Sequence, residues 1–174
     1  MNPRPTLADL LQGFADAPPV PVRGIGSDSR RLDEGYLFLA VQGLTSHGLD
    51  FVAEALESGV SAIAWDTSTG SPPSDTGIPT IPVENLASRL GEIANRFYGH
   101  PSEQLEVIGV TGTNGKTTVA WMIAQAADIL GEQCAYLGTL GHGLGELQGS
   151  EGMTTPAVVE MHDRLAGFVE QGAG

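Results

Sequence analysis

Along the first hundred residues, short runs of apolar residues alternate with stretches in which apolar residues recur at helical spacing. The runs 36–41 (YLFLAV) and 60–65 (VSAIAW) have the length of buried strands, and 78–83 is a third run weakened by two prolines. The stretches 49–58 and 85–98 carry their apolar residues on one helical face. Alternating strands and helices predict an α/β domain with a largely parallel sheet.

A short helix at 6–13 precedes these elements, with Thr6 as its N-cap and Gly13 as its stop. Residues 67–77 are rich in Ser, Thr, Pro, Gly and Asp, so they predict a surface loop. The polar stretch 99–104 (GHPSEQ) is the best candidate for a domain boundary.

A new pattern begins after this boundary. Residues 105–111 (LEVIGVT) predict a buried strand, 119–130 an apolar helix and 134–140 (CAYLGTL) a second strand. Strand, helix and strand form a βαβ unit, which is right-handed in nearly all proteins. The expected domains are therefore 1–99 and 100–174.

The stretch 141–152 is glycine-rich and predicts a loop. After it, Thr155 and Pro156 open a last helix with the proline in its first turn. A doubly wound domain needs more than two strands. We therefore expect the chain to be the N-terminal part of a longer protein, cut inside its second domain.

The charge balance narrows the classes of partner. Eight Lys and Arg residues oppose 21 Asp and Glu residues, which gives a formal net charge of −13. Duplex nucleic acids and anionic membranes attract basic surfaces, so neither partner is expected. No apolar run approaches the roughly 18 residues of a membrane span, and the N-terminus lacks the apolar core of a signal peptide. Cys134 is the one cysteine, so the chain has no intrachain disulfide, which suits a reducing cytosol. We expect a soluble cytoplasmic protein, and we expect it to be monomeric.

The strongest chemical signal is the glycine-rich stretch 112–118 (GTNGKTT), which lies between a predicted strand and a predicted helix. Such glycines let backbone N–H groups turn towards phosphate oxygens, and the helix N-terminus adds partial positive charge. Lys116, the only lysine, would reach the β- and γ-phosphates of ATP as the catalytic residue, and the Thr117 hydroxyl would hold Mg²⁺. The candidate nucleotide-binding residues are Gly112, Thr113, Asn114, Gly115, Lys116, Thr117 and Thr118.

This loop departs from the general pattern G-x-x-x-x-G-K-[ST], because Val110 stands where the first glycine is expected and Gly109 comes one residue earlier. The alternative is a glycine turn with a surface lysine. The only lysine of an acidic chain lies where phosphate chemistry needs it, so we interpret the stretch as a variant phosphate loop.

Residues 110–118 (VTGTNGKTT) resemble the ATP-binding loop of the Mur ligases and of their folylpolyglutamate synthetase relatives. The stretches 27–30 (SDSR), 35–40 (GYLFLA) and 47–48 (HG) resemble the N-terminal uridine-nucleotide domain of two Mur ligase types. One type adds the third amino acid of the peptide, and the other adds D-Ala-D-Ala. The motif 154–156 (TTP) resembles the type that adds the third amino acid.

The resemblance implies a small α/β uridine-nucleotide domain, followed by the start of a doubly wound, parallel-sheet ATPase domain. It implies an ATP- and Mg²⁺-dependent ligase of peptidoglycan synthesis. ATP would phosphorylate the glutamate side chain of UDP-N-acetylmuramoyl-L-alanyl-D-glutamate, and the amine of meso-diaminopimelate or L-lysine would displace that phosphate. The choice of diamino acid stays open. The chain alone is expected to be inactive, because the family's other catalytic groups would lie beyond Gly174.

The resemblance also implies a set of substrate contacts, which are Ser27, Ser29, Leu44, Thr45 and Ser46 for the uridine nucleotide and Thr154 and Thr155 for the muramoyl-peptide. From the residues alone, SDSR is equally an aspartate-capped turn and Thr-Thr-Pro is a helix start. His47 is either a ligand contact or a loop residue. Some members carry Asn before the two threonines, whereas Met153 stands here.

Two other functions stay open at this point. The first is the D-Ala-D-Ala-adding Mur ligase, against which the Thr-Thr-Pro motif argues. The second is a non-catalytic nucleotide-binding module. No spacing of Cys and His indicates a zinc site.

Overall fold

The computed structural model describes residues 4–43, 46–71, 73, 75–149 and 155–174. Contacts within it divide the chain into two units, unit 1 (Met1–Phe97) and unit 2 (Tyr98–Gly174). The helix expected at 85–98 and the strand expected at 105–111 thus fall mainly into different units, with the division close to the expected boundary at 99–104.

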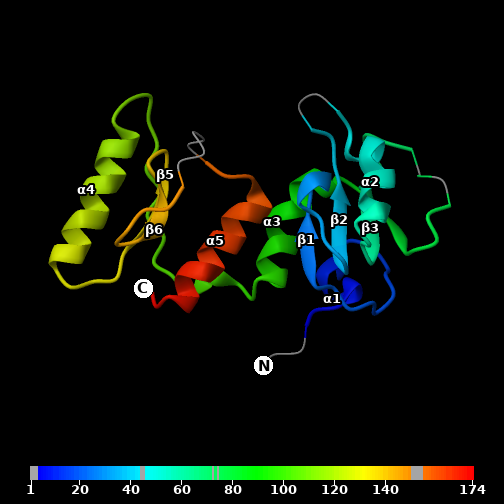
Figure 1. The fold of residues 1–174 in the computed structure, drawn as a ribbon, viewed down its shortest axis with the longest axis horizontal. Coiled ribbons are helices and arrows are strands. Elements are labelled where there is room, and N and C mark those ends of the chain that lie inside the picture. The colour runs from blue at the N-terminus through cyan, green and yellow to red at the C-terminus, as the bar shows by residue number, and fades with distance from the viewer. Residues whose placement is uncertain (1–3, 44–45, 72, 74, 150–154) are drawn as a thin grey trace. The chain divides into compact units, whose positions relative to one another are not determined.

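Unit 1 is built on one parallel sheet (Figure 1). Its strands follow one another in space as they do in the sequence, and every neighbouring pair is parallel. They are β1 (Gly24–Gly26), β2 (Tyr36–Ala40), β3 (Ala62–Asp66) and β4 (Thr80–Val83). Because parallel strands end at the same edge, the loops after β1, β2 and β3 all leave from one edge of the sheet.

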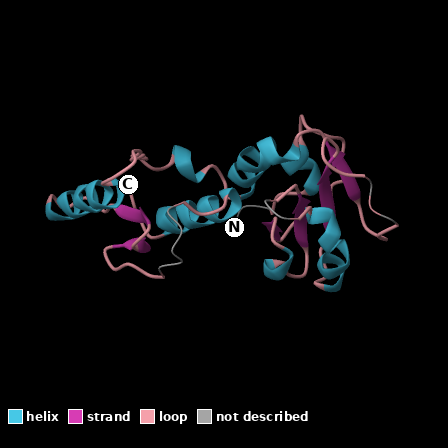
Figure 2. Ribbon diagram, turned by 90° about the horizontal axis from the view of Figure 1, so that it is seen from above, coloured by secondary structure: helices cyan, strands magenta, loops and turns pink. Residues whose placement is uncertain are grey.

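Helices cover both faces of this sheet (Figure 2). The α-helices are α1 (Leu7–Leu11), α2 (Val52–Glu57) and α3 (Leu86–Phe97), and the 3₁₀ helices are η1 (Ser29–Arg31) and η2 (Gly48–Phe51). Thr6 caps α1 as expected, with its hydroxyl accepting from the Asp9 N–H at 3.3 Å. The sequence-based prediction of an α/β fold with a parallel sheet is confirmed.

The burial of strand β2 explains why its apolar residues form a continuous run in the sequence. Successive side chains of a strand point to opposite faces, and all residues from Leu37 to Ala40 are buried. Phe38 and Ala40 belong to a cluster with Ile63, Trp65 and residues of α2. A strand that is buried on both faces needs no polar side.

Arg96 of α3 ties that helix to the end of α1. Its guanidinium donates to the carbonyl oxygens of Leu10 at 3.0 Å and Gln12 at 2.7 Å. It also lies 4.7 Å from the centre of the Phe14 ring, and Arg89 lies 5.0 Å from the same ring. The last carbonyls of a helix have no partner within the helix, so Arg96 satisfies groups that a five-residue helix leaves open.

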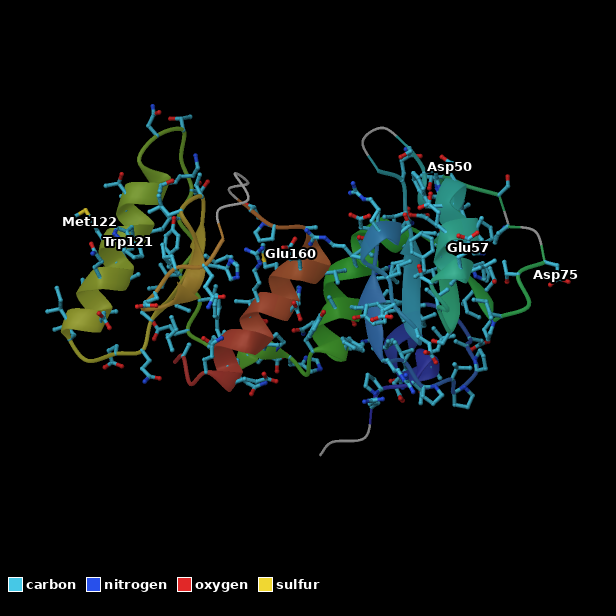
Figure 3. All side chains as sticks on the ribbon, viewed as in Figure 1. Asp50, Glu57, Asp75, Trp121, Met122 and Glu160 are labelled. Atoms are coloured by element: carbon cyan, nitrogen blue, oxygen red, sulfur yellow. The ribbon has the colours of Figure 1, made fainter. Side chains whose placement is uncertain are left out.

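Unit 2 contains two long helices and a hairpin. Helix α4 (Lys116–Ile129) is followed by the antiparallel strands β5 (Ala135–Gly138) and β6 (Gly141–Leu144), and the chain ends with α5 (Val158–Glu170). A short 3₁₀ helix, η3 (Pro101–Glu103), contacts α5. Met122 projects from the outer side of α4 (Figure 3), and 62% of it is exposed.

Four local predictions for unit 2 are wrong. Residues 105–111 form no strand, and Val107 and Ile108 are 60% and 61% exposed. In the part of the chain that the structure describes, β5 pairs only with its neighbour β6, so the predicted βαβ pairing of 105–111 with 134–140 is not formed. A hairpin closes over a short loop, whereas a parallel pair must close a long one.

The other two errors concern glycine and proline. The predicted loop at 141–152 begins with β6, in which Gly143 has φ +156° and a Cβ would collide with the Glu146 carbonyl oxygen. Only glycine fits there, so the glycines mark a tight hairpin. Pro156 precedes the first turn of α5, because Ala157 is the N-cap and the helix begins at Val158.

Among the helices that the structure describes, none is both long enough and apolar enough to cross a bilayer.

The contact between α1 and α3 predicts a stability difference between two arginine variants. Arg96→Met should lower the free energy of unfolding by about 1–3 kcal/mol, because the Leu10 and Gln12 carbonyls lose a charged donor. Arg89→Met removes a cation over the same ring but none of these hydrogen bonds, and should cost less than about 1 kcal/mol. Urea unfolding of both variants measures this, and equal losses would contradict it.

Candidate functional site

The phosphate-loop stretch turns on two glycines with positive φ. Gly112 has φ +147°, and Gly115 has φ +76° and ψ −3°, in the left-handed region. A side chain at either position would be strained. Gly115 is the N-cap of α4, so the loop passes directly into the helix at Lys116. The expected sequence of glycine turn and helix start is therefore present.

No side chain caps the start of α4. The first N–H groups of a helix have no partner within the helix, and they carry the positive end of its dipole. Gly112, Thr113, Asn114 and Gly115 are all exposed. The loop therefore presents uncapped backbone donors to solvent, an arrangement suited to an anion such as phosphate.

Lys116 lies at the first position of α4, and its ammonium bends over the loop. Its Nζ donates to the Gly112 carbonyl oxygen at 2.5 Å. An ammonium has three protons, so this contact leaves two donors for other acceptors. The only ammonium side chain in the protein is thus held above the loop by the loop itself.

Thr117 follows on the first turn, and its hydroxyl lies 3.4 Å from that of Thr139. A cavity of about 460 Å³ within unit 2 is lined by Lys116, Thr117 and Thr139, and also by Thr155. Two predicted nucleotide residues and one predicted peptide-contacting residue therefore share one cavity. Thr154, the other predicted peptide contact, lies outside the described residues.

The predicted uridine contacts in unit 1 follow β1 and β2. Ser27 comes directly after β1, and Ser46 lies between β2 and η2. This carboxyl edge is where open α/β sheets bind ligands. Leu44 and Thr45 lie outside the described residues.

Ser29 is placed differently from Ser27. It is buried, and its hydroxyl donates to the Glu54 carboxylate at 2.8 Å. Next to it, the Asp28 carboxylate accepts two hydrogen bonds from the Arg30 guanidinium at 2.9 and 2.7 Å. The Arg30 guanidinium lowers the pKa of Asp28, and Asp28 raises the pKa of Arg30. The side chains of SDSR thus hold the turn together, as the capped-turn interpretation expects.

His47 caps η2. Its Nδ1 accepts from the Leu49 N–H at 3.0 Å, so the proton of the neutral ring lies on Nε2. Nε2 is 2.9 Å from the Thr69 hydroxyl, which therefore accepts. The ring joins the loop after β2 to the loop after β3. These contacts agree with the interpretation of His47 as a structural loop residue.

Asp66 is a buried residue that the sequence analysis did not single out. It ends β3, and its carboxylate accepts from the Ser68 N–H and hydroxyl and from the Ala87 N–H near the start of α3. Burial raises the pKa of Asp66, but these hydrogen bonds outweigh it, and the net effect lowers that pKa. An aspartate at the end of a buried strand, followed two residues later by serine, was the signal available in the sequence.

In the described residues, no group of three or more His, Cys, Asp and Glu side chains is arranged to hold a metal ion. Near the phosphate loop, the hydroxyl oxygens of Thr117 and Thr139 lie 3.4 Å apart.

Two family models match the chain. The Mur ligase family, catalytic domain, matches residues 21–98, and the Mur ligase middle domain matches residues 110–174. A curated relative from Pseudomonas putida is named UDP-N-acetylmuramoyl-L-alanyl-D-glutamate--2,6-diaminopimelate ligase. It is 44% identical over 166 residues, which cover 94% of this chain and 33% of the relative. The chain thus spans about a third of that relative's length.

Solved structures of related ligases share the fold. A structure of UDP-N-acetylmuramoyl-L-alanyl-D-glutamate--2,6-diaminopimelate ligase matches with a TM-score of 0.73 at 24% identity, over 97% of this chain and 34% of that one. The structure of MurF ligase from Thermotoga maritima in complex with ADP matches with a TM-score of 0.51 at 24% identity, over 81% of this chain and 29% of that one. At this identity the likeness concerns the fold.

The Asp66 contacts predict a pH-dependent stability difference. A lowered pKa gives stability that is present above the ordinary pKa of aspartate, about 3.9, and is lost as pH falls through the lower folded pKa. Asp66→Asn should therefore be less stable than the parent at pH 7, and the difference should shrink below about pH 4. Urea unfolding between pH 3 and 7 measures this.

The matched control is Asp75→Asn, since Asp75 is an exposed loop residue (Figure 3). It should follow the parent at every pH. A constant deficit of Asp66→Asn down to pH 3 would contradict a contribution from the Asp66 charge.

Proposed function

The chain belongs to the Mur ligase family, and we propose that its protein is the ATP-dependent ligase that adds diaminopimelate to UDP-N-acetylmuramoyl-L-alanyl-D-glutamate. The observation that carries this proposal is the uncapped start of α4, with Lys116 held above the loop and Thr117 beside it. The choice of family member is supported by the name of the 44% identical relative. That name favours diaminopimelate over lysine as the amine substrate.

The proposed reaction has two steps. In the first, a carboxylate oxygen of the substrate glutamate attacks the γ-phosphorus of ATP, the bond to the bridging oxygen breaks, and ADP leaves. In the second, the diamino acid nitrogen attacks the acyl carbon, the bond from carbon to the phosphate oxygen breaks, and phosphate leaves as the nitrogen loses a proton. Such phosphoryl transfer depends mainly on positioning and charge neutralisation.

The residues of unit 2 fit the first step. The N–H groups at the start of α4 would bind phosphate oxygens, and the two remaining donors of Lys116 would bind the β- and γ-phosphates. Mg²⁺, when bound, supplies positive charge to the same oxygens, and the Thr117 hydroxyl would hold it. Mg²⁺ keeps several waters and takes further ligands from substrate phosphates, so the Thr117 hydroxyl would be one of several ligands.

The proposed contacts of the muramoyl-dipeptide are assigned within each unit by itself. We assign Ser27 and the loop after β2, including Ser46, to the uridine nucleotide, and Thr155 to the peptide side. Because the Ser29 hydroxyl is used by Glu54, we assign Ser29 the role of shaping the turn that presents Ser27. Residues 1–99 would thus form the uridine-nucleotide domain and residues 100–174 the beginning of the ATP-binding domain.

These residues would act in the cytoplasm, as a monomer, where ATP and nucleotide-linked precursors are available. Since the chain spans about a third of its relative, we expect these 174 residues to bind ligands without turning them over. Their behaviour alone would then be that of a nucleotide-binding module.

The test is a calorimetric titration of the folded chain with UDP-N-acetylmuramoyl-L-alanyl-D-glutamate, beside UDP-glucose as a control. Saturable binding of the muramoyl-dipeptide, clearly tighter than that of the control, supports the ligase. Equal affinity for both ligands would mean that only the UDP part is recognised, and would contradict the proposed substrate.

Lys116→Ala should abolish measurable ATP binding, because the loop loses its only ammonium. Binding of the uridine nucleotide should stay within about twofold, since its proposed contacts lie elsewhere. Parallel titrations with ATP and with the muramoyl-dipeptide measure the two effects. An equal loss of both would contradict separate sites.

A further inference from the structure

Two hydroxyl groups from distant parts of the sequence meet beside the phosphate loop. Thr117 lies on the first turn of α4, and Thr139 directly follows β5, 22 residues later. The Thr117 hydroxyl donates to the Thr139 oxygen at 3.4 Å. Both residues line the cavity that Lys116 also lines.

The direction of this hydrogen bond matters for metal binding. A threonine hydroxyl has one proton and two lone pairs. A metal ion binds a lone pair, so the proton has to point away from the ion towards an acceptor. Thr139 provides that acceptor.

We propose that Thr139 is a positioning residue that holds the Thr117 hydroxyl with its lone pairs turned towards the Mg²⁺ of a bound nucleotide. This rests on the proposed function, since it assumes that Thr117 holds the ion. Groups that orient a metal ligand from behind typically change metal affinity about 10- to 100-fold when they are removed.

The fold fixes the position of Thr139 by packing on two sides. The Tyr136 ring of β5 meets the Trp121 ring of α4 edge to face, with centroids 5.4 Å apart and planes at 89°. On the other side, β6 pairs with β5 up to the last residue of that strand, Gly138, which faces Gly141. The strand end that carries Thr139 is thus held against the helix that carries Thr117.

Gly138 allows this close packing. A Cβ at Gly138 would lie 2.5 Å from the Tyr136 hydroxyl oxygen, so any larger residue would displace the ring. The ring in turn contacts Trp121, which is four residues after Thr117 on the same helix. The absence of a side chain at Gly138 therefore contributes to the distance between the two threonines.

The experiment compares Thr139→Val with Thr139→Ser in the 174-residue chain. Valine has nearly the shape of threonine but no hydroxyl, whereas serine keeps the hydroxyl. ATP affinity is measured by calorimetry in excess Mg²⁺ and again in EDTA. We expect Thr139→Val to weaken ATP binding about 10- to 100-fold in Mg²⁺ and to leave it within about twofold in EDTA. Thr139→Ser should stay within about threefold of the parent in both.

A second readout follows the metal directly. Mn²⁺ is titrated into the ADP complex and its bound fraction is measured by electron paramagnetic resonance, with the same order of the three proteins expected. An equal loss in Mg²⁺ and in EDTA would assign Thr139 a packing role only, and an unchanged Thr139→Val would overturn the proposal outright. A parent chain that binds no ATP would instead refute the proposed function, and this inference with it.

Discussion

The start of α4 is the constraint on which the chemistry proposed for this protein depends. A helix has to leave its first N–H groups without internal partners, and here no side chain satisfies them because Gly115 is the N-cap. The left-handed backbone of Gly115 brings the loop straight into the helix axis. This single turn places the backbone donors, the ammonium of Lys116 and the hydroxyl of Thr117 within one short segment. Everything proposed for unit 2 is arranged around those groups.

The two units satisfy their apolar residues in different ways. In unit 1, helices cover both faces of a parallel sheet, and the sheet interior is fully buried. In unit 2, several large apolar residues stay exposed, among them Val107, Ile108, Ile129 and Leu130. An apolar surface of this kind is typical of a face that another segment or chain covers. The sequence pattern reads such residues as buried, because it records apolar character and not the presence of a neighbour.

This difference explains which predictions succeeded. Strands β2 and β3 were predicted because a strand that is buried on both faces is a continuous apolar run. The glycine turn and helix start at 112–118 were predicted because glycine, lysine and threonine stand at short fixed spacings, and their phosphate-binding role stays a prediction. The strand predicted at 105–111 is not formed, because apolar composition alone does not provide a strand to pair with. Asp66 and Thr139 were missed because their contacts join residues about 20 positions apart, which only the folded chain brings together.

The acidic composition is compatible with the anionic ligands proposed here, because their binding depends on local donors. At about 0.15 M salt, charges more than roughly 8 Å apart are largely screened, so a carboxylate farther than this from the loop contributes little there. At the loop itself the ligand would meet the backbone N–H groups at the start of α4 and the ammonium of Lys116. A chain with a single lysine concentrates its strongest point charge at one position. Net charge therefore affects the association with large charged partners such as nucleic acid. The binding of a phosphate depends on the geometry of the loop.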